Sequence, residues 1–346
     1  MRVTRCEPNE REKLVTSERN GREQRDATGR RAAAAEAEAE AEAEAEAGTG
    51  TGGPVDAATE DFVDHRNLLF TVAYEMLGSA ADAEDVLQET WLKWAGVDLA
   101  TVRDRRAYLV RITTRQALNR LRTLGRRKET YVGSWLPEPL LTTPDVAEDV
   151  ELADSVSMAM MLVLETLAPV ERAVFVLREV FDLGYGEIAE AVEKSPAAVR
   201  QIAHRARAHV AARRPRGEVS ATESREALAA FRRAVETGDL QGLLDILSPD
   251  VVLLGDGGGI KQAVLRPVTG AGKVARFMLG GLAKQAAALS LGAAQVNGYP
   301  ALIVRLDGEL DTVLAVRFDE GRITGLYAVR NPEKLSHMHR ETALRR

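Results

Sequence analysis

The sequence is poor in the residues that build disulfides, metal sites and membrane spans. It has one cysteine, Cys6, which excludes an intrachain disulfide, and its five histidines are scattered without zinc-ligand spacing. It has no run of about 18 apolar residues, as a spanning helix would need. No apolar core follows the charged residues at its start, so we expect no secretory signal. These absences favour a cytoplasmic protein that needs neither a metal nor a cofactor.

Aromatic residues make up 5% of the chain, so its cores must be built mainly from Leu, Val, Ile and Ala. With 346 residues it has room for two or three domains. An Ala-Glu repeat near the start forms no apolar stripe, which favours disorder there. The predicted segments are a disordered low-complexity tail (1–59), a helical domain (60–128), a linker (129–157), a second helical domain (158–216), an α+β domain (220–338) and a short tail (339–346).

Charge is strongly segregated along this chain of formal net charge -6. Residues 103–128 contain ten Arg and Lys against one acid, and residues 194–216 contain seven against none. Two basic blocks in an acidic chain indicate two separate contacts with a polyanion. Solvated helix faces are the alternative for either block taken alone.

The second basic block has the pattern of a helix-turn-helix. A short amphipathic helix over 185–192 is followed by a turn, then by Ser195 as an N-cap and Pro196 at the first helical position. The next helix buries an apolar stripe and leaves a basic surface that fits a DNA major groove. The candidate DNA contacts are Ser195, Ala197, Arg200, Gln201, His204 and Arg205.

The first helical domain carries an acidic surface and a basic one. Asp82, Asp85 and Glu89 lie away from the apolar stripe of a helix that begins near Ser79. In the Arg-rich helix that follows, steps of four, four and three residues predict a second, basic face. The residues of that face are Arg111, Arg115, Asn119 and Arg122.

The last domain alternates as antiparallel hairpins over 301–330, with turns at Asp307-Gly308 and Glu320-Gly321. Between Ser224 and Arg330 it has neither histidine nor cysteine, which argues against an enzyme. The stretch DGGG from Asp256 permits close approach of another chain segment. It is either a turn in the sheet or a docking point for the linker or for the segment around NPEKL, residues 331–335.

Both helical domains resemble parts of bacterial sigma factors. LAPVERAVFVLREVFDLGYGEIAEAVEKSPAAVRQIAHRARAHV is similar to the minus-thirty-five-binding domain of the extracytoplasmic-function group, and LLFTVAYEMLGSAADAEDVLQETWLKW with RAYLVRITTRQALNRLR is similar to its other domain. The resemblance implies that Asp82, Asp85 and Glu89 bind RNA polymerase. It also implies that the loop 96–105 and the Arg-rich helix melt and read the minus-ten element.

Three further motifs resemble a subgroup with a fused C-terminal SnoaL-like domain, an α+β cone that regulates the sigma domains. They are YVGSWLPEPL, DGGG and NPEKL. The subgroup has Lys directly after DGGG, whereas here Ile260 stands between the glycines and Lys261, and Glu333 replaces the Asp that is usual in the last motif. The resemblance implies regulatory contacts between domains. The residues are Trp135, Leu136, Pro137, Asp256, Gly257, Gly258, Gly259, Asn331, Pro332, Lys334 and Leu335.

The predicted protein is therefore a multidomain sigma factor with RNA polymerase core and promoter DNA as partners and no membrane contact. A one-component helix-turn-helix regulator without a polymerase role is the alternative, and an enzyme carrying a helix-turn-helix is third. The acid-and-tryptophan helix distinguishes them, because a plain repressor has no use for it. Binding of a small ligand by the C-terminal domain stays open.

Overall fold

The computed structural model describes residues 54–213, 221–282 and 288–346. Residues Ala58–Arg346 form one compact unit; of the other unit, Met1–Ala57, the described part is the start of helix α2 (Pro54–Leu77). Most of the predicted 1–59 tail thus lies outside the described residues. Its end was placed too late, because Ala58 is already buried and its carbonyl accepts a hydrogen bond from Trp94 Nε1 at 2.8 Å.

The first helical part consists of α2, α3 (Ala80–Trp94), the short η1 (Leu99–Thr101) and α4 (Arg105–Glu129). Ser79 begins α3 as predicted, since its side chain accepts a hydrogen bond from the backbone of Asp82 at 3.1 Å. Trp94 at the end of α3 is fully buried and lies 5.8 Å from the Tyr108 ring of α4. The aromatic end of α3 thus joins all three long helices.

The predicted linker 129–157 is not a simple connection. Residues 130–143 lack helix, but α5 (Pro144–Glu148) and α6 (Val150–Val156) follow. Asp149 caps α6 by accepting a hydrogen bond from Leu152 N at 3.1 Å. Pro144, Asp145, Asp149 and Glu151 of the predicted linker are therefore helix-start residues, in agreement with their usual preference for caps and first turns, whereas Pro137 and Pro139 lie in the non-helical part.

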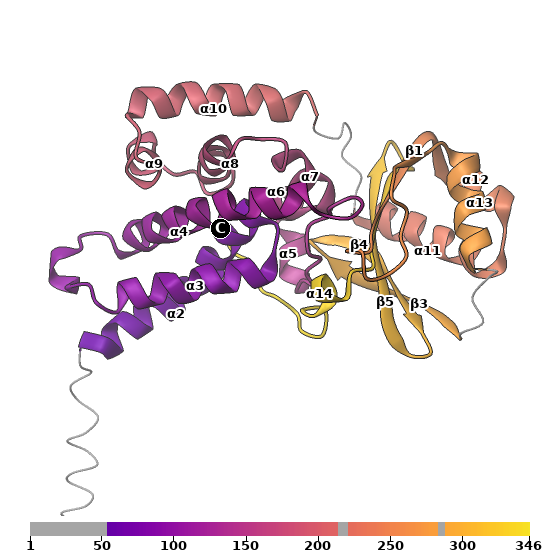
Figure 1. Cartoon of the computed structure of the whole chain (residues 1–346), viewed down its shortest axis with the longest axis horizontal. Coiled ribbons are helices and arrows are strands. Elements are labelled where there is room, and N and C mark those ends of the chain that lie inside the picture. Colours follow the sequence, from indigo (N-terminus) through magenta and orange to yellow (C-terminus); the bar gives the residue numbers. More distant parts are fainter. Residues whose placement is uncertain (1–53, 214–220, 283–287) are drawn as a thin grey trace, which may run out of the picture. The chain divides into compact units, whose positions relative to one another are not determined.

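The second helical part contains the predicted helix-turn-helix. Its elements are α7 (Met158–Leu164), α8 (Pro169–Phe175), the π-helical η2 (Val176–Val180), α9 (Tyr185–Val192) and α10 (Pro196–Ala211). Helix α10 packs on α8 and α9, and α9 also packs on α4 of the first helical part (Figure 1). The last residues of the predicted 158–216 domain lie outside the described part.

The C-terminal part is an α+β domain, as predicted. It contains α11 (Ala221–Thr237), α12 (Leu240–Ile246), β1 (Leu247–Asp256), β2 (Val268–Thr269), α13 (Ala271–Leu282), β3 (Leu289–Val296), β4 (Tyr299–Leu306), β5 (Glu309–Asp319), β6 (Arg322–Val329) and α14 (Pro332–Leu335). The strand order is β2-β1-β6-β5-β4-β3, with β1 parallel to β6 and the other pairs antiparallel. The predicted hairpin turns are confirmed, with positive φ at Asp307 and Glu320.

The sheet is covered on both faces. Helices α11, α12 and α13 pack on one face, around Phe231, Leu243 and Leu326 (Figure 1). The other face carries Tyr327 and Val329, which belong to a cluster with linker and α7 residues. The linker is therefore part of the core that joins the sheet to the helices.

The prediction that residues 339–346 form a short tail is wrong. Leu344 is 2% exposed and belongs to the hydrophobic core of the helical parts. Figure 1 marks the C-terminal end of the chain among those helices. The segment after α14 therefore returns from the sheet to the helices, which composition alone could not indicate.

Candidate nucleic-acid interface and the contacts that cover it

Helix α10 presents the predicted DNA-contact residues to solvent. Ser195 Oγ accepts a hydrogen bond from Ala198 N at 3.2 Å, and Pro196 opens the helix. Glu193, which ends α9, has a left-handed φ of 55° and so makes the turn tight. Six predicted contacts are exposed: Ser195, Ala197, Arg200, Gln201, His204 and Arg205. The apolar stripe of α10 is buried beneath them, so this surface is available in the structure as it stands.

The basic face of α4 is in a different situation, because α9 covers part of it. Arg111 Nη1 lies 3.0 Å from Glu190 Oε2. Arg115 Nη2 donates to the backbone carbonyl of Glu190 at 2.8 Å and lies 3.4 Å from a Glu193 carboxylate oxygen. Asn119 and Arg122, further along α4, are exposed and hydrogen-bonded to each other at 3.1 Å. Two of the four predicted residues therefore face protein carboxylates.

The predicted polymerase-binding acids divide between buried and exposed positions. Asp82 is buried and shares Arg120 of α4 with the exposed Asp85, at 2.6 and 2.5 Å. Glu89 is exposed and accepts a hydrogen bond from Gln116 of α4. These pairs fix α3 to α4. Asp85 and Glu89 still face solvent, whereas Asp82 mainly holds the helix pair together.

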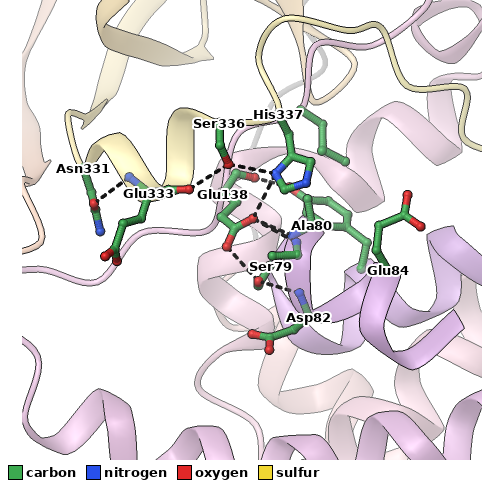
Figure 2. Close-up of polar contacts among 12 residues, drawn as sticks. Ser79, Ala80, Asp82, Glu84, Glu138, Asn331, Glu333, Ser336 and His337 are labelled. Carbon is green, nitrogen blue, oxygen red and sulfur yellow. Dashed lines mark hydrogen bonds and ion pairs between the residues drawn. The ribbon is translucent and has the colours of Figure 1, made fainter. Parts of the chain in front are cut away.

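The linker motif docks onto the start of α3 through Glu138. Its carboxylate accepts hydrogen bonds from Ser79 Oγ at 2.7 Å, Ala80 N at 2.7 Å and Ala81 N at 3.2 Å. Figure 2 shows this carboxylate at the helix start, with His337 of the segment after α14 beside it, 4.0 Å away. A carboxylate at a helix N-terminus satisfies unpaired donors and complements the helix dipole. Glu138 thereby fastens the linker to the helix that carries Asp85 and Glu89.

Trp135 of the same motif lies between two cations. The Nζ atoms of Lys128 (α4) and Lys334 (α14) are 3.6 and 4.0 Å from its ring centre. Gly78 meets the ring closely, since a Cβ added there would lie 3.0 Å from it. The tryptophan thus contacts the end of α2, the end of α4 and the C-terminal domain at once.

Asp256 is the centre of the contact between the linker and the C-terminal domain. It is completely buried, and its Oδ1 accepts hydrogen bonds from Tyr131 Oη at 2.6 Å and Gly258 N at 3.1 Å. Its Oδ2 accepts hydrogen bonds from Leu136 N at 2.9 Å and Lys334 Nζ at 2.8 Å. Burial lowers the pKa of Lys334, and Asp256 opposes that effect. The sequence showed no partner for Asp256, but the structure supplies four.

The glycines after Asp256 allow this close approach. A Cβ on Gly258, whose φ is +63°, would lie 2.4 Å from the Asn331 side chain. One on Gly259, whose φ is +73°, would lie 3.3 Å from Val132 of the linker. The structure thus brings the linker, DGGG and NPEKL motifs together. The buried members of the predicted set are Leu136, Pro137, Asp256, Gly257, Asn331, Lys334 and Leu335. Trp135 and Gly258 are partly buried. Pro332 is exposed and opens α14.

Lys261, displaced by one position from the family pattern, has a structural partner. Its Nζ lies 3.0 Å from Asp311 on β5, and Arg330 lies 3.0 Å from the same carboxylate. Although partial burial acts to raise the pKa of Asp311, the hydrogen bonds from Arg330, Thr312 and Lys261 lower it to about 2. Lys261 therefore ties the DGGG loop to β5.

A contact that sequence reasoning missed is the Asn297-Gly298 turn between β3 and β4. Asn297 is buried, and its Nδ2 donates to Tyr74 Oη at 2.7 Å and to the Val156 carbonyl at 2.8 Å. Its Oδ1 accepts from Leu140 N at 3.0 Å. Asn-Gly marked the hairpin turn, but nothing local in the sequence indicated that the turn inserts among α2, the linker and α6. Tyr131 and Glu138 were missed likewise, although both belong to the quoted motif.

Glu75 is a buried carboxyl where α2, α6 and α8 meet. Ser155 Oγ donates to its Oε1 at 2.8 Å, and its Oε2 is buried without a hydrogen-bond partner among the described residues. Arg172 of α8 donates to the backbone carbonyl of Glu75 at 2.8 Å and lies 2.5 Å from Glu165. Burial raises the pKa of Glu75 to about 8, against the opposing effects of Ser155 and Arg172.

Replacing Glu75 with Gln is expected to flatten the pH dependence of stability. Between pH of about 4.5 and about 8 the folded protein holds a proton on Glu75 that the unfolded chain has released. The free energy of unfolding therefore falls as pH rises, by at most about 1.4 kcal/mol per pH unit from this group. Urea unfolding near the two ends of this pH window measures the change in the free energy of unfolding. The exposed Glu148→Gln serves as the control. If Glu75→Gln left the slope of the unfolding free energy against pH unchanged, the raised pKa of Glu75 would be contradicted.

Neither a metal cluster nor a membrane helix was found in the described ranges. In 54–213, 221–282 and 288–346, no group of three or more His, Cys, Asp or Glu side chains is placed to hold a metal ion. Within the same ranges no helix is both long and apolar enough to cross a bilayer.

Comparisons with known proteins place both helical parts in one family. The Sigma-70 region 2 family model matches residues 62–127, and the Sigma-70, region 4 model matches residues 157–210. "ECF RNA polymerase sigma factor SigJ" of Mycobacterium tuberculosis (strain ATCC 25618 / H37Rv) is 36% identical over 297 residues, which cover 80% of this chain and 92% of SigJ. "Probable ECF RNA polymerase sigma factor SigI" of the same strain is 32% identical over 291 residues, covering 83% and 97%.

The similarity extends to a solved structure. The crystal structure of the extracytoplasmic function sigma factor SigJ of Mycobacterium tuberculosis aligns with a TM-score of 0.66 at 33% identity. The alignment covers 81% of this chain and 98% of that chain. It therefore extends beyond the two helical parts into the C-terminal domain.

Proposed function

Because the chain belongs to the extracytoplasmic-function sigma factors of RNA polymerase, in the group with a fused C-terminal SnoaL-like domain, we propose that it directs the polymerase core to promoters and opens them. The first helical part binds the core and reads the minus-ten element. Helix α10 binds the minus-thirty-five duplex. The plain helix-turn-helix regulator is not favoured, since it has no use for a region 2 domain.

The structure corresponds to a closed form, and the ion pairs between α4 and α9 carry this proposal. Arg111 and Arg115 contact Glu190 and Glu193 at the face where they would meet DNA phosphates. A carboxylate and a phosphate cannot occupy that place together, so α9 must leave α4 before the minus-ten element is read. Helix α10 needs no such change, because its contact residues are already exposed. The closed chain therefore has its minus-thirty-five contacts free and half of its predicted minus-ten contacts covered.

The C-terminal domain stabilises this closed form by holding the linker. Asp256 and Asn297 bind linker backbone amides, and Glu138 of the linker binds the start of α3. Because the linker connects the two helical parts, fixing it favours their docked arrangement over the spread one. Regulation then takes the form of a shift between two states of one chain.

The C-terminal domain acts without catalysis in this proposal. Asp256 is the carboxylate of this domain that lies at its junction with the linker. That group is fully buried, and its two oxygens accept four hydrogen bonds from the chain itself. A carboxylate engaged in this way contributes structure and offers no free position to a substrate.

Reversing the charge of Glu190 and Glu193 is expected to open the α4 face. Each of the two ion pairs contributes about 0.2–1 kcal/mol, so binding of the free chain to a minus-ten single strand should rise by roughly two- to thirtyfold. Fluorescence anisotropy at fixed salt measures this. The control variant Glu226→Lys with Glu236→Lys on α11 makes the same change in net charge. An equal gain in strand binding by that control would mean that the added positive charge attracts DNA nonspecifically.

Transcription tests the function as a whole. Sigma-free polymerase core mixed with the chain is expected to initiate at discrete sites on promoter fragments selected by that complex from random DNA. Core alone should give only nonspecific initiation. If the chain binds DNA and yet adds no site-specific initiation, it is the plain regulator instead.

A further inference from the structure

The segment after α14 runs back to the linker and pairs with it through an isolated bridge. Thr342 N donates to the Leu141 carbonyl at 2.7 Å, and Thr143 N donates to the Thr342 carbonyl at 3.4 Å. Thr142 and Thr342 form a parallel bridge. Extended peptides bind other proteins by this kind of backbone pairing, in which main-chain hydrogen bonds supply the affinity.

Two residues further on, one side chain is taken into the helical core. Leu344 is 2% exposed, although both its neighbours have more accessible side chains. Arg345 N donates to Thr71 Oγ1 of α2 at 3.0 Å, which fixes the backbone at the mouth of this pocket. Leu344 is therefore the anchor residue of the segment, whereas the exposed side chain of Arg345 contributes little to its binding.

The end of the segment meets opposite charge. Arg346 Nε lies 2.9 Å from Asp149 Oδ2, and its Nη1 contacts Glu151. These acids belong to the α5–α6 part of the linker, whose carboxylates outnumber its cations. The groove thus combines a strand edge, an apolar pocket and an acidic end, in the order in which Thr342, Leu344 and Arg346 occur.

We propose that residues 341–346 are an internal peptide ligand in a displaceable groove formed by α2, residues 141–143 and the Asp149–Glu151 turn. Occupancy holds linker residues 140–156 against α2. The contact is separate from the Asp256 contacts and adjoins those of the Asn297-Gly298 turn, because Thr142 also pairs with Gln295 and Gly298. It involves few residues, so it can be released while the sheet keeps its fold. Any effect of this contact on transcription rests on the proposed function, but the binding of residues 341–346 to the groove does not.

A peptide supplied in trans tests the groove without polymerase or DNA. A labelled peptide of residues 339–346 is expected to bind the chain that lacks residues 341–346, as measured by anisotropy. It should bind the full chain far more weakly, because the tethered segment acts at an effective concentration in the millimolar range. A Leu344→Ala peptide should bind on the order of 10- to 100-fold more weakly, and an Arg345→Ala peptide should bind equally well.

Hydrogen exchange supplies the second readout. Deletion should speed the exchange of backbone amides in 140–156, and the added peptide should restore their protection. If the shortened chain does not fold, the full chain with Leu344→Ala replaces it, and should take up more labelled peptide than the unaltered chain.

Three results would overturn the proposal. One is a folded shortened chain that does not bind the peptide. Another is equal binding of the peptide by the full and shortened chains, since the site would then lie elsewhere. The third is a Leu344→Ala peptide as tight as the native one. None of them bears on whether the chain is a sigma factor, so the two proposals fail separately.

Discussion

A chain with Arg200→Glu and Arg205→Glu should lose its affinity for the promoter duplex and keep its affinity for polymerase core. Both side chains are exposed on α10, where the structure places them at the solvent surface of the helix-turn-helix. Each charge reversal removes a phosphate or base contact and adds a carboxylate facing DNA phosphates. Losing two base contacts of about 1–3 kcal/mol each already weakens binding by 100-fold or more at the centre of that range.

Gel-shift titration measures the affinity for the promoter duplex, and co-purification measures the affinity for polymerase core. Arg205 lies 3.7 Å from Glu171, so thermal unfolding is needed to show that α8 and α10 stay packed in the variant. Lys273→Glu with Arg276→Glu on exposed α13 positions makes the same change in net charge. If that control lost duplex binding equally, or if the α10 variant lost core binding as well, separate surfaces for DNA and polymerase would be ruled out.

Removing the Asp256 carboxylate should produce the largest loss of stability of any single substitution considered. Asp256→Ala leaves the buried Lys334 ammonium without its partner, and breaking a buried ion pair on one side costs about 3–5 kcal/mol. Leu136 N and Tyr131 Oη lose their acceptor at the same time. The linker should then separate from the C-terminal domain, which shifts the chain toward the open form.

Denaturant unfolding and a transcription assay measure these two consequences. Asp250→Ala, at an exposed position on the same strand, should change stability by less than about 0.5 kcal/mol. The double variant Asp256→Ala with Lys334→Met removes the unpaired charge and should recover part of the loss. A single variant that is as stable as Asp250→Ala would show that the junction contributes nothing.

Features set by neighbouring residues could be predicted from the sequence. Ser195 and Pro196 began a helix where expected, because a cap and a proline at the first position act locally. The turns at Asp307 and Glu320 formed because Asp-Gly and Glu-Gly tolerate positive φ between alternating strands. The DGGG stretch predicted either a turn or a docking point, and it has features of both, since Gly258 and Gly259 have positive φ and lie against Asn331 and Val132.

Features that depend on distant segments could not be predicted in the same way. The basic block of α4 predicted a polyanion, but its residues Arg111 and Arg115 lie against Glu190 and Glu193, about 80 residues further along the chain. Glu138 looked like a linker charge, but its carboxylate accepts hydrogen bonds from the first backbone amides of α3. Leu344 stood alone in a polar stretch, and one apolar residue makes no periodic pattern that a reader of the sequence could detect.

In the proposed function, the closed arrangement separates the two DNA contacts in time. With α10 exposed and α4 partly covered, we expect a free chain to bind a minus-thirty-five duplex much better than the minus-ten element. Binding to polymerase must supply the free energy that moves α9 from α4. This order also protects the chain from melting DNA in the absence of the enzyme.

Footprinting of one selected promoter, with the chain free and then bound to polymerase core, tests this account most directly. The free chain should protect a single patch at the minus-thirty-five duplex. The complex should protect two patches and make thymines near the minus-ten element reactive to permanganate. Protection of both elements by the free chain, or a complex that protects neither, would contradict it.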